Sequence, residues 1–289
     1  MKEQEDLGAK LGDFYRTYKS ADSSKNLSLK TEIEALSQRY EILEPIGEGG
    51  LKSVWAARDL KTGRDLALAY PKEKNDESVE MLLHEARVTA ALNHPNIIPV
   101  YDIECEADVF FTMKKLGGGN LYDLLKRKDF RNDSWFLLQV FSRVCDALAF
   151  SHSKGVIHLD VKPDNIQVDD YGTVLLIDWG LAASFSTEEG RHVRSIADQD
   201  DLICGTIGYI SPEQVNCQEG IVDERSDIYA LGGLLHYILT GEIALDSQLS
   251  APFERVKKGE LNLFVKGLEL PEGLRAITKK AMELDAGKR

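Results

Sequence analysis

The first part of the chain carries short runs in which hydrophobic residues recur at strand-like spacing. These runs occupy residues 40–43, 53–57, 64–70, 97–103 and 109–113. Between the third and fourth runs, residues 78–92 carry apolar side chains at helical spacing, and this helix is expected to end before Asn93. The pattern therefore predicts a small sheet with one main helix. Residues 1–38 are polar and charged, and they are predicted to form an N-terminal extension outside this core.

Three glycines at 117–119 interrupt this pattern and predict a hinge. Beyond them the spacing is mainly helical, and helices are expected at residues 135–152, 227–239 and 274–284, the second of them buried. We therefore predict an α+β fold within residues 39–289, with a small antiparallel-sheet N-lobe at 39–116 and a larger helical C-lobe at 117–289. A small ligand is expected to bind in a cleft between such lobes.

Composition and charge narrow the function classes. The chain has 289 residues, of which 43% are hydrophobic, so it can bury a large core. Its net charge is -13 and no block of Lys or Arg stands out, so neither nucleic acid nor an anionic membrane is expected as a main partner. The four cysteines lack paired spacing, which favours a reducing compartment. Neither a signal peptide nor a membrane segment is apparent, so a soluble cytoplasmic protein is expected.

The most informative stretch is residues 158–165, with the sequence His-Leu-Asp-Val-Lys-Pro-Asp-Asn. An apolar strand at 174–177 follows it and leads into Asp178-Trp179-Gly180. Buried acids cost free energy unless something pairs them, and a divalent cation would do so. The spacing resembles the protein-kinase catalytic loop, H-R-D-x-x-x-x-N, followed by D-F-G. The resemblance extends from about Tyr40 to Arg289 and implies the bilobal protein-kinase fold.

The resemblance implies a role for each residue of this stretch. Asp160 would accept the proton of a substrate hydroxyl or orient that hydroxyl, and Lys162 would neutralise the γ-phosphate of ATP. Asn165 and Asp178 would hold Mg²⁺, with Mn²⁺ as an alternative metal. His158 is interpreted as a core histidine.

The nucleotide-binding half of the resemblance begins at Gly47-Glu48-Gly49-Gly50, which taken alone would be read as a hairpin turn. Between two strand patterns it resembles the kinase Gly-rich loop, whose backbone amides approach phosphates. The resemblance also implies that Met113 is the gatekeeper and that Lys114–Leu116 form the hinge that binds adenine. The remaining positions expected to contact the nucleotide are Val54, Ala67, Glu85 and Gln167.

The lysine that kinases carry on the third strand is absent, because Ala69 occupies its position. Lys72 and Lys74 follow Pro71, which should end the strand, so neither is expected to substitute. Lys52, however, stands where the third glycine of the Gly-rich loop is expected.

Alternation along the strands places Lys52 on the face shared by Val54, and Ala69 on the face shared by Ala67. The resemblance to kinases implies that Val54 and Ala67 both cover the adenine, so Lys52 and Ala69 are expected to be neighbours on adjacent antiparallel strands, facing the same cleft. This resembles the with-no-lysine protein kinases, in which the catalytic lysine replaces that glycine. A pair between Lys52 and Glu85 is expected in the active arrangement.

Other residues resemble the scaffold of Ser/Thr-specific kinases. Thr206 would bridge toward Asp160 and Lys162. Glu213, in a segment that resembles the A-P-E motif, would pair with Arg289. Asp227 would cap the backbone of the catalytic loop.

Several departures from the family pattern keep alternatives open. Leu159 replaces the Arg of H-R-D, which usually receives an activation-loop phosphate, and Trp179 replaces the Phe of D-F-G. Gln167 lies where an apolar residue normally supports adenine. The loop that follows is acidic and carries Ser and Thr residues, and a solvated loop is expected over residues 184–201.

The overall texture resembles a bacterial Ser/Thr kinase of the eukaryotic type, acting on Ser or Thr of a protein substrate. The alternative is a pseudokinase that serves as a nucleotide-binding or regulatory scaffold. A third hypothesis is that Ala69 was introduced to silence an ordinary kinase. The chain stops before the usual last helix, so a regulatory partner or further domains beyond Arg289 are also expected.

Overall fold

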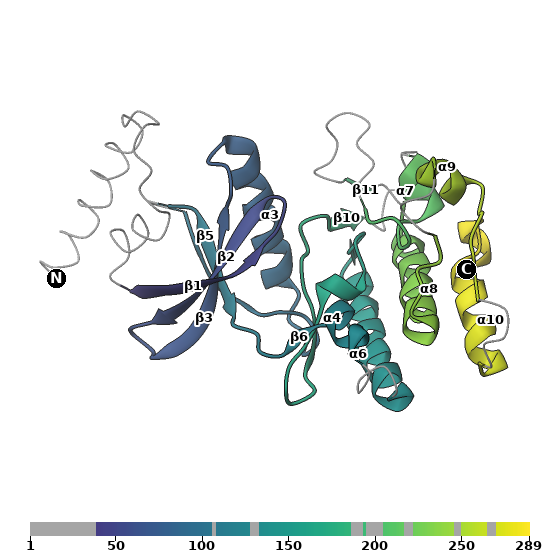
Figure 1. The fold of residues 1–289 in the computed structure, drawn as a ribbon. Helices are drawn as coiled ribbons and strands as arrows, with labels where there is room; N and C mark the ends of the chain where they lie inside the picture. The colour runs from purple at the N-terminus through teal and green to yellow at the C-terminus, as the bar shows by residue number, and fades with distance from the viewer. Residues whose placement is uncertain are drawn as a thin grey trace, which may run out of the picture. The chain divides into compact units, whose positions relative to one another are not determined.

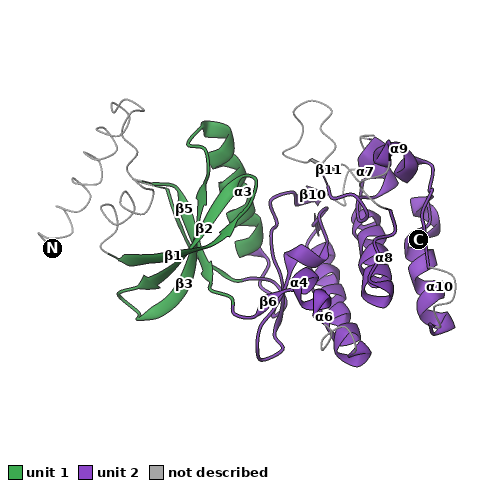
Figure 2. Ribbon diagram, in the orientation of Figure 1, with its two compact units in different colours: residues 1–90, 99–116 green, residues 91–98, 117–289 purple. Residues whose placement is uncertain are grey.

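The computed structural model describes residues 39–105, 108–127, 133–185, 193–194, 205–216, 222–245, 250–264 and 270–289. The chain divides into two compact units, drawn in green and purple in Figure 2. Unit 1 takes residues 1–90 and 99–116, and unit 2 takes residues 91–98 and 117–289. The predicted N-terminal extension and most of the predicted acidic loop lie outside the described residues.

Unit 1 is an antiparallel sheet with one helix (Figure 1). Its strands follow the order β1-β2-β3-β5-β4. They are β1 (Tyr40–Glu48), β2 (Lys52–Asp59), β3 (Arg64–Pro71), β4 (Val100–Glu104) and β5 (Phe110–Lys114). Helix α3 (Asp76–Ala91) follows β3, and its start is fixed by Asn75, whose side-chain oxygen accepts a hydrogen bond from the Ser78 amide at 2.8 Å.

The core of unit 1 explains why these residues form these elements. Ala69 of β3 and Phe111 of β5 pack against Leu82 and Ala86 of α3, so the apolar stripe of the helix is buried on the sheet. The fourth predicted strand, at residues 97–103, begins three residues later than predicted: β4 starts at Val100, because Ile97 instead forms a parallel bridge with Leu176 inside unit 2.

Unit 2 is mainly helical, with short strands between the helices (Figure 1). Its helices are α4 (Leu121–Lys126), α6 (Ser134–Ser153), α7 (Pro212–Asn216), α8 (Glu224–Thr240), α9 (Pro252–Lys257) and α10 (Glu272–Ala281). Its strands are β6 (Gly119–Asn120), β7 (Val156–Ile157), β8 (Ile166–Val168), β9 (Val174–Leu176), β10 (Ala183–Phe185) and β11 (Val193–Arg194). Two 3₁₀ turns, η1 (Pro163–Asn165) and η2 (Ala286–Lys288), complete the described part.

Helix α8 is the buried helix that the sequence predicts, and it contacts both α6 and α10. Two adjacent glycines allow close approach on its two sides. A Cβ atom on Gly232 would lie 2.5 Å from the Met282 side chain, and one on Gly233 would lie 2.7 Å from the carbonyl oxygen of Gly208. The helix therefore needs both glycines where α10 and the Gly208 turn pack against it.

The strands of unit 2 form two small sheets, ordered β6-β8-β9 and β11-β10-β7. Gly118, within the three-glycine run, has a φ of +69°, and a Cβ there would lie 2.1 Å from the Val168 carbonyl oxygen. Only glycine fits this approach to β8. No helix in the described parts of the chain is both long enough and apolar enough to cross a membrane.

Candidate active site

The register of β2 and β3 decides where Lys52 lies relative to Ala69. Val54 lies directly opposite Ala69, and Lys52 lies opposite Pro71, two pairs further along. Lys52 and Ala69 are therefore diagonal neighbours on the same face of the sheet, as the sequence analysis predicts. The register follows from the turn between Asp59 and Arg64, because loop length fixes the pairing of a hairpin.

Lys52 forms an ion pair with Glu85 of α3, as the sequence analysis expected. Both side chains are largely buried, so solvent screens this pair less than a surface pair. Glu85 is held in the middle of its helix, where its carbonyl oxygen also accepts a hydrogen bond from the Thr89 hydroxyl at 2.7 Å. Unit 1 thus presents a lysine–glutamate pair although β3 carries alanine at position 69.

The two lysines beyond Pro71 have other carboxylate partners. The ammonium of Lys72 lies 2.8 Å from Glu48, within the glycine-rich segment. That of Lys74 lies 3.7 Å from Asp108. These contacts agree with the expectation that neither lysine takes the place of the missing one.

The glycine-rich segment forms the turn between β1 and β2. The amide of Gly49 donates a hydrogen bond to the carbonyl oxygen of Lys52 at 2.9 Å, which closes the turn. Gly47 lies opposite Val54, and a Cβ added to Gly50 would meet no atom within 4 Å. The segment is therefore a hairpin turn in its backbone, which is compatible with a phosphate-binding loop.

The predicted adenine-lining positions of unit 1 also share one region of the sheet. Val54 and Met113 are partly buried against the same cluster as Ala69, and Met113 pairs directly with Ala67. Lys114 continues β5, and its amide donates to the carbonyl oxygen of Pro99 at 3.2 Å. Leu116 is the last residue of unit 1.

In unit 2, the Asp160 carboxylate is the centre of a polar cluster. It is only 8% exposed. Lys162 donates to its Oδ2 at 2.6 Å, and the hydroxyl of Thr206 donates to its Oδ1 at 2.8 Å. Lys162 also donates to the Thr206 hydroxyl oxygen at 2.9 Å, so the three side chains close a triangle, as the sequence analysis expected for Thr206.

Asp227 holds the backbone just before Asp160. Its carboxylate, 0% exposed, accepts hydrogen bonds from the amides of His158 and Leu159, both at 2.9 Å. Burial alone would raise the pKa of Asp227, but the hydrogen bond and charge of His152, together with the His158 contacts, outweigh it and lower that pKa. The expected capping role of Asp227 is therefore present, and His152 is a partner that the sequence pattern did not indicate.

Asn165 and Asp178 lie at adjacent ends of the β8–β9 hairpin. Ile166 pairs with Leu176, and the amide of Ile177 donates to the carbonyl oxygen of Asn165 at 2.9 Å. The Asn165 amide nitrogen donates to Asp160, which leaves its side-chain oxygen outside those bonds. One amide oxygen and one carboxylate are donors that suit Mg²⁺, which usually keeps waters or phosphate oxygens as further ligands.

Within the described ranges, no group of three or more His, Cys, Asp or Glu residues could by itself hold a metal ion. Asp178 itself has a φ of +65°, an uncommon conformation for a residue with a side chain. Such strain, about 1–3 kcal/mol, is often found at functional sites.

Trp179 and His158 pack against each other, and each is next in sequence to a loop that carries a proposed site residue. Their rings lie 4.5 Å apart at 55°, and both side chains are fully buried. The His158 ring lies 3.2 Å from the Ile177 carbonyl oxygen, which agrees with its interpretation as a core histidine. The Trp179 indole nitrogen has no hydrogen-bond partner among the described residues.

Gln167 donates a hydrogen bond to the carbonyl oxygen of Gly117 at 3.1 Å. Its amide nitrogen is therefore engaged within unit 2, next to the glycine run.

Glu213 lies in the first turn of α7, and its carboxylate accepts two hydrogen bonds from the Arg289 guanidinium, one of them 2.8 Å long. Ser226 also donates to Glu213 at 2.7 Å. Burial raises the pKa of Glu213, but the hydrogen bond and charge of Arg289 more than offset it, so the pKa lies below its usual range. The predicted Glu213–Arg289 pair is thus present and buried.

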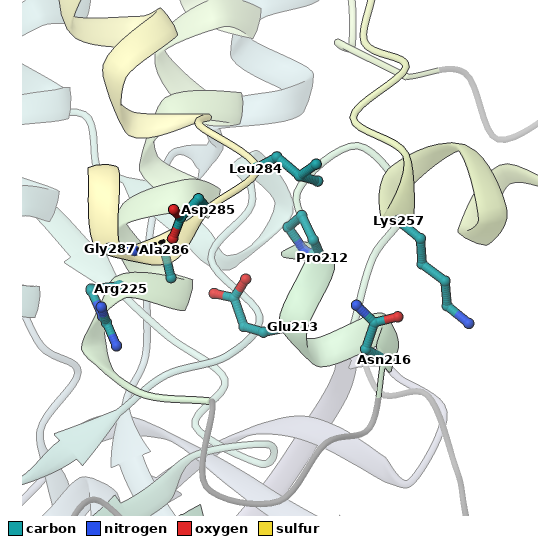
Figure 3. A pocket seen from close by; sticks show the side chains of 9 residues that line it. All are labelled: Pro212, Glu213, Asn216, Arg225, Lys257, Leu284, Asp285, Ala286 and Gly287. Carbon is teal, nitrogen blue, oxygen red and sulfur yellow. Dashed lines mark hydrogen bonds between the residues drawn. The ribbon is translucent and has the colours of Figure 1, made fainter.

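Beside this pair lies a pocket of about 520 Å³ (Figure 3). Its walls come from α7, α8, α9 and the C-terminal turn, and they are formed by Pro212, Glu213, Asn216, Arg225, Lys257, Leu284, Asp285, Ala286 and Gly287. Arg225 is already paired with Asp223 at 2.6 Å, and Lys257 with Glu254 at 3.3 Å. We assign this pocket no part in the chemistry of Asp160.

Comparison with known proteins identifies the family. Residues 40–283 match the protein kinase domain, so this chain belongs to that family. It is 32% identical over 303 residues to serine/threonine-protein kinase PknD of Protochlamydia amoebophila, covering 91% of this chain and 29% of that protein. It is 34% identical over 257 residues to serine/threonine-protein kinase PknB of Mycobacterium tuberculosis, covering 86% of this chain and 40% of that protein.

A third relative is serine/threonine-protein kinase PrkC of Bacillus subtilis, 31% identical over 217 residues, or 74% of this chain and 32% of that protein. The chain thus spans less than half the length of these relatives. The predicted protein-kinase fold and the predicted likeness to bacterial Ser/Thr kinases are confirmed.

Proposed function

We propose that this chain transfers the γ-phosphoryl group of ATP to Ser or Thr hydroxyls of a protein, with Lys52 as the phosphate-binding lysine. The observation that carries the proposal is the Asp160–Lys162–Thr206 triangle, which places a carboxylate, an ammonium and a hydroxyl within hydrogen-bond reach of one another. The protein kinase family uses ATP and a divalent metal, and the names of the relatives support Ser/Thr as the acceptor.

In the proposed reaction the substrate hydroxyl oxygen forms a bond to the γ-phosphorus, while the bond to the β,γ-bridging oxygen breaks. ADP leaves with that electron pair, and the hydroxyl proton passes to Asp160. Lys162 neutralises charge on the transferred group. Phosphoryl transfer depends mostly on positioning and charge neutralisation, so few side chains suffice.

A divalent metal, when bound, supplies positive charge to the phosphates, and Asn165 and Asp178 are the residues proposed to hold it. Mg²⁺ is proposed, with Mn²⁺ as an alternative. Both proposed ligands offer oxygen, and Asn165 is oriented by its bonds to Asp160.

The role of Lys52 is supported by its ion pair with Glu85. In kinases the strand lysine pairs with the helix glutamate, and here Lys52 makes that pair in its place. We propose that Gly47, Gly49, Gly50, Val54, Ala67, Met113, Lys114, Leu116 and Gln167 contact the nucleotide.

We also propose that residues 39–289 form the catalytic domain, preceded by an N-terminal extension at 1–38. Because the relatives are longer, further domains and a regulatory partner belong to the proposal. The scattered cysteines support the cytoplasm as the compartment, and Cys105 and Cys145 are unbonded thiols.

The alternative is a pseudokinase that acts as a scaffold. It is favoured by Ala69 and Gln167, whereas the intact Asp160, Asn165 and Asp178 favour the enzyme.

The experiment that separates these functions is transfer of radiolabelled phosphate from Mg·ATP to the chain itself and to a generic basic protein. Lys52→Ala and Asp160→Asn are each expected to reduce the rate by about a hundredfold or more, because a transition-state charge contact is lost. Lys74→Ala removes a lysine that has another partner and should leave the rate unchanged. A parent that neither transfers phosphate nor binds ATP supports the scaffold instead. If Lys52→Ala alone stays active, the relocated-lysine proposal is wrong.

A further inference from the structure

Leu159, the residue directly before Asp160, has a backbone conformation that must be held in place. Its φ is +64°, in the left-handed region that residues with a side chain rarely adopt. Any relaxation of this residue would turn the peptide that leads into Asp160. The orientation of the Asp160 carboxylate therefore depends on whatever fixes Leu159.

Two side chains from different helices hold the two polar groups of Leu159. Its amide donates to Asp227 of α8 at 2.9 Å. Its carbonyl oxygen accepts a hydrogen bond from the side-chain nitrogen of Gln214, in α7, at 2.9 Å. The sequence pattern predicts the first of these contacts but not the second.

Gln214 is itself fixed at its other end. Its side-chain oxygen accepts hydrogen bonds from the amide of Ser211 at 3.1 Å and from the hydroxyl of Ser211 at 3.0 Å. Ser211 is 0% exposed and Gln214 is 8% exposed. With donors at its oxygen and an acceptor at its nitrogen, the amide has one orientation that satisfies all partners.

The same segment also carries Thr206. The amides of Tyr209 and Ile210 donate to the carbonyl oxygen of Thr206 at 3.0 and 2.9 Å, and Ser211 follows directly. The Thr206 hydroxyl binds Asp160. The segment from Thr206 to Gln214 is therefore joined to the catalytic loop at two points, the carbonyl oxygen of the Leu159–Asp160 peptide and the side chain of Asp160.

We propose that Gln214 is a positioning residue for phosphoryl transfer, which sets the orientation of Asp160 through the carbonyl oxygen of Leu159. The inference rests on the proposed kinase function. Gln214 is not proposed to contact the substrate hydroxyl or the phosphates of ATP, and it acts only through the backbone of Leu159. In this chain Leu159 occupies the position at which kinases carry an arginine, and its side chain cannot donate a hydrogen bond. The hydrogen bond from Gln214 to the Leu159 carbonyl oxygen instead links the catalytic loop to α7.

The test uses two variants of Gln214 and one matched control in the full chain. Gln214→Glu keeps an oxygen for Ser211 but loses the donor to Leu159, and Gln214→Ala loses both. Gln139→Ala makes the same truncation at an exposed position of α6. Both Gln214 variants should lower kcat about tenfold or more, since small misplacement of reacting groups is costly, while KM for ATP changes less than twofold. The control should match the parent.

A second readout does not depend on activity. Hydrogen–deuterium exchange of the amides at 159–162 should speed up in Gln214→Glu and not in Gln139→Ala, measured well below the thermal midpoint of each variant. Unchanged exchange overturns the inference whether or not the parent is active. Faster exchange with a kcat within twofold of the parent overturns the positioning role. If the parent protein transfers no phosphate, the proposed function is wrong. Faster exchange in Gln214→Glu would in that case still show that Gln214 stabilises the conformation of the catalytic loop.

Discussion

The ammonium of Lys52, on β2, and the carboxylate of Glu85, on α3, form an ion pair across the core of unit 1. Ala69 of β3 lies on the same face as Lys52 and packs against α3 with its methyl group. A cation therefore reaches the helix glutamate from β2, and β3 contributes only apolar packing at that level.

If Lys52 and Glu85 act as one unit, their substitutions should not add. Lys52→Ala and Glu85→Ala are each expected to lower kcat/KM strongly, by about tenfold or more for Glu85→Ala, and the double variant should be little slower than Lys52→Ala. The matched control is the exposed pair Arg58–Asp65 across β2 and β3, whose double alanine variant should keep the parent rate. Steady-state kinetics on all variants measures this. If the double variant loses the product of the two single-variant factors in kcat/KM, Lys52 and Glu85 act independently and the prediction is wrong.

Arg289 should contribute a large part of the stability of unit 2. Its guanidinium is buried against Glu213, so Arg289→Met would leave an unpaired buried carboxylate and lower the free energy of unfolding by about 3–5 kcal/mol. Lys288→Ala, one residue earlier and exposed, should change it by less than about 0.5 kcal/mol. Urea unfolding followed by circular dichroism gives both values. Similar midpoints for the two variants would show that the buried pair is dispensable.

Gly233 and Gly273 offer a matched pair of helical glycines. A Cβ on Gly233 would lie 2.7 Å from the Gly208 carbonyl oxygen, whereas one on Gly273 in α10 would meet no atom within 4 Å. Gly233→Ala should therefore destabilise the chain by about 1–3 kcal/mol despite better helix propensity, and it should slow phosphoryl transfer because Gly208 belongs to the turn after Thr206. Gly273→Ala should be neutral or stabilising by up to about 1 kcal/mol. Thermal unfolding compares them, and equal midpoints would contradict the predicted clash.

Stability should fall on mild acidification because of His236. This buried imidazole donates from Nδ1 to the Glu242 carbonyl oxygen at 2.9 Å and accepts at Nε2 from the Phe264 amide at 3.1 Å. Burial lowers the pKa of His236, and the hydrogen bond to Glu242 offsets only part of that effect. The unfolded chain then binds a proton near pH 6.5 while the folded chain does not, so stability declines below that pH by at most about 1.4 kcal/mol per pH unit.

The variant His236→Gln removes the titrating group and should flatten this decline, although its stability at neutral pH is expected to be lower. Urea midpoints measured at several pH values between about 7.5 and 5 test it. A second decline, below about pH 4, should remain in both proteins, since the pKa values of Glu213 and Asp227 lie below their ordinary ones and protonation removes their contribution. A parent whose midpoint is constant from neutral pH to about 5 would refute the role of His236.

The sequence could predict the elements and many of the polar contacts because these follow from local periodicity and from motif spacing. Helix α6, the buried helix α8 and the Lys52–Glu85 pair are examples of features predicted in this way. The exact partner of Ala69 could not be predicted, because it depends on the turn that sets the β2–β3 register.

Sequence reasoning missed those contacts between distant segments that no family motif indicates. Gln214 reaches Leu159 across 55 residues, and His152 reaches Asp227 across 75. Neither residue has a periodicity or spacing that signals its partner, since the contact exists only once α7, α6 and α8 are packed. Ile97 likewise joins Leu176 because of tertiary packing, although its own segment reads as a strand.

The Asp160 carboxylate has about four lone-pair positions at which it can accept hydrogen bonds. Thr206 fills one on Oδ1, and Lys162 and Asn165 each fill one on Oδ2. One position is thus left, enough for a single incoming hydroxyl without displacing any of these donors. An asparagine at position 160 would replace one carboxylate oxygen by an NH₂ group, which can donate hydrogen bonds but not accept them. This NH₂ group would then face either the ammonium of Lys162 or another hydrogen-bond donor. Asp160→Asn should therefore displace the side chains that bind Asp160 as well as remove a negative charge. We expect a larger effect than the small change in side-chain size suggests.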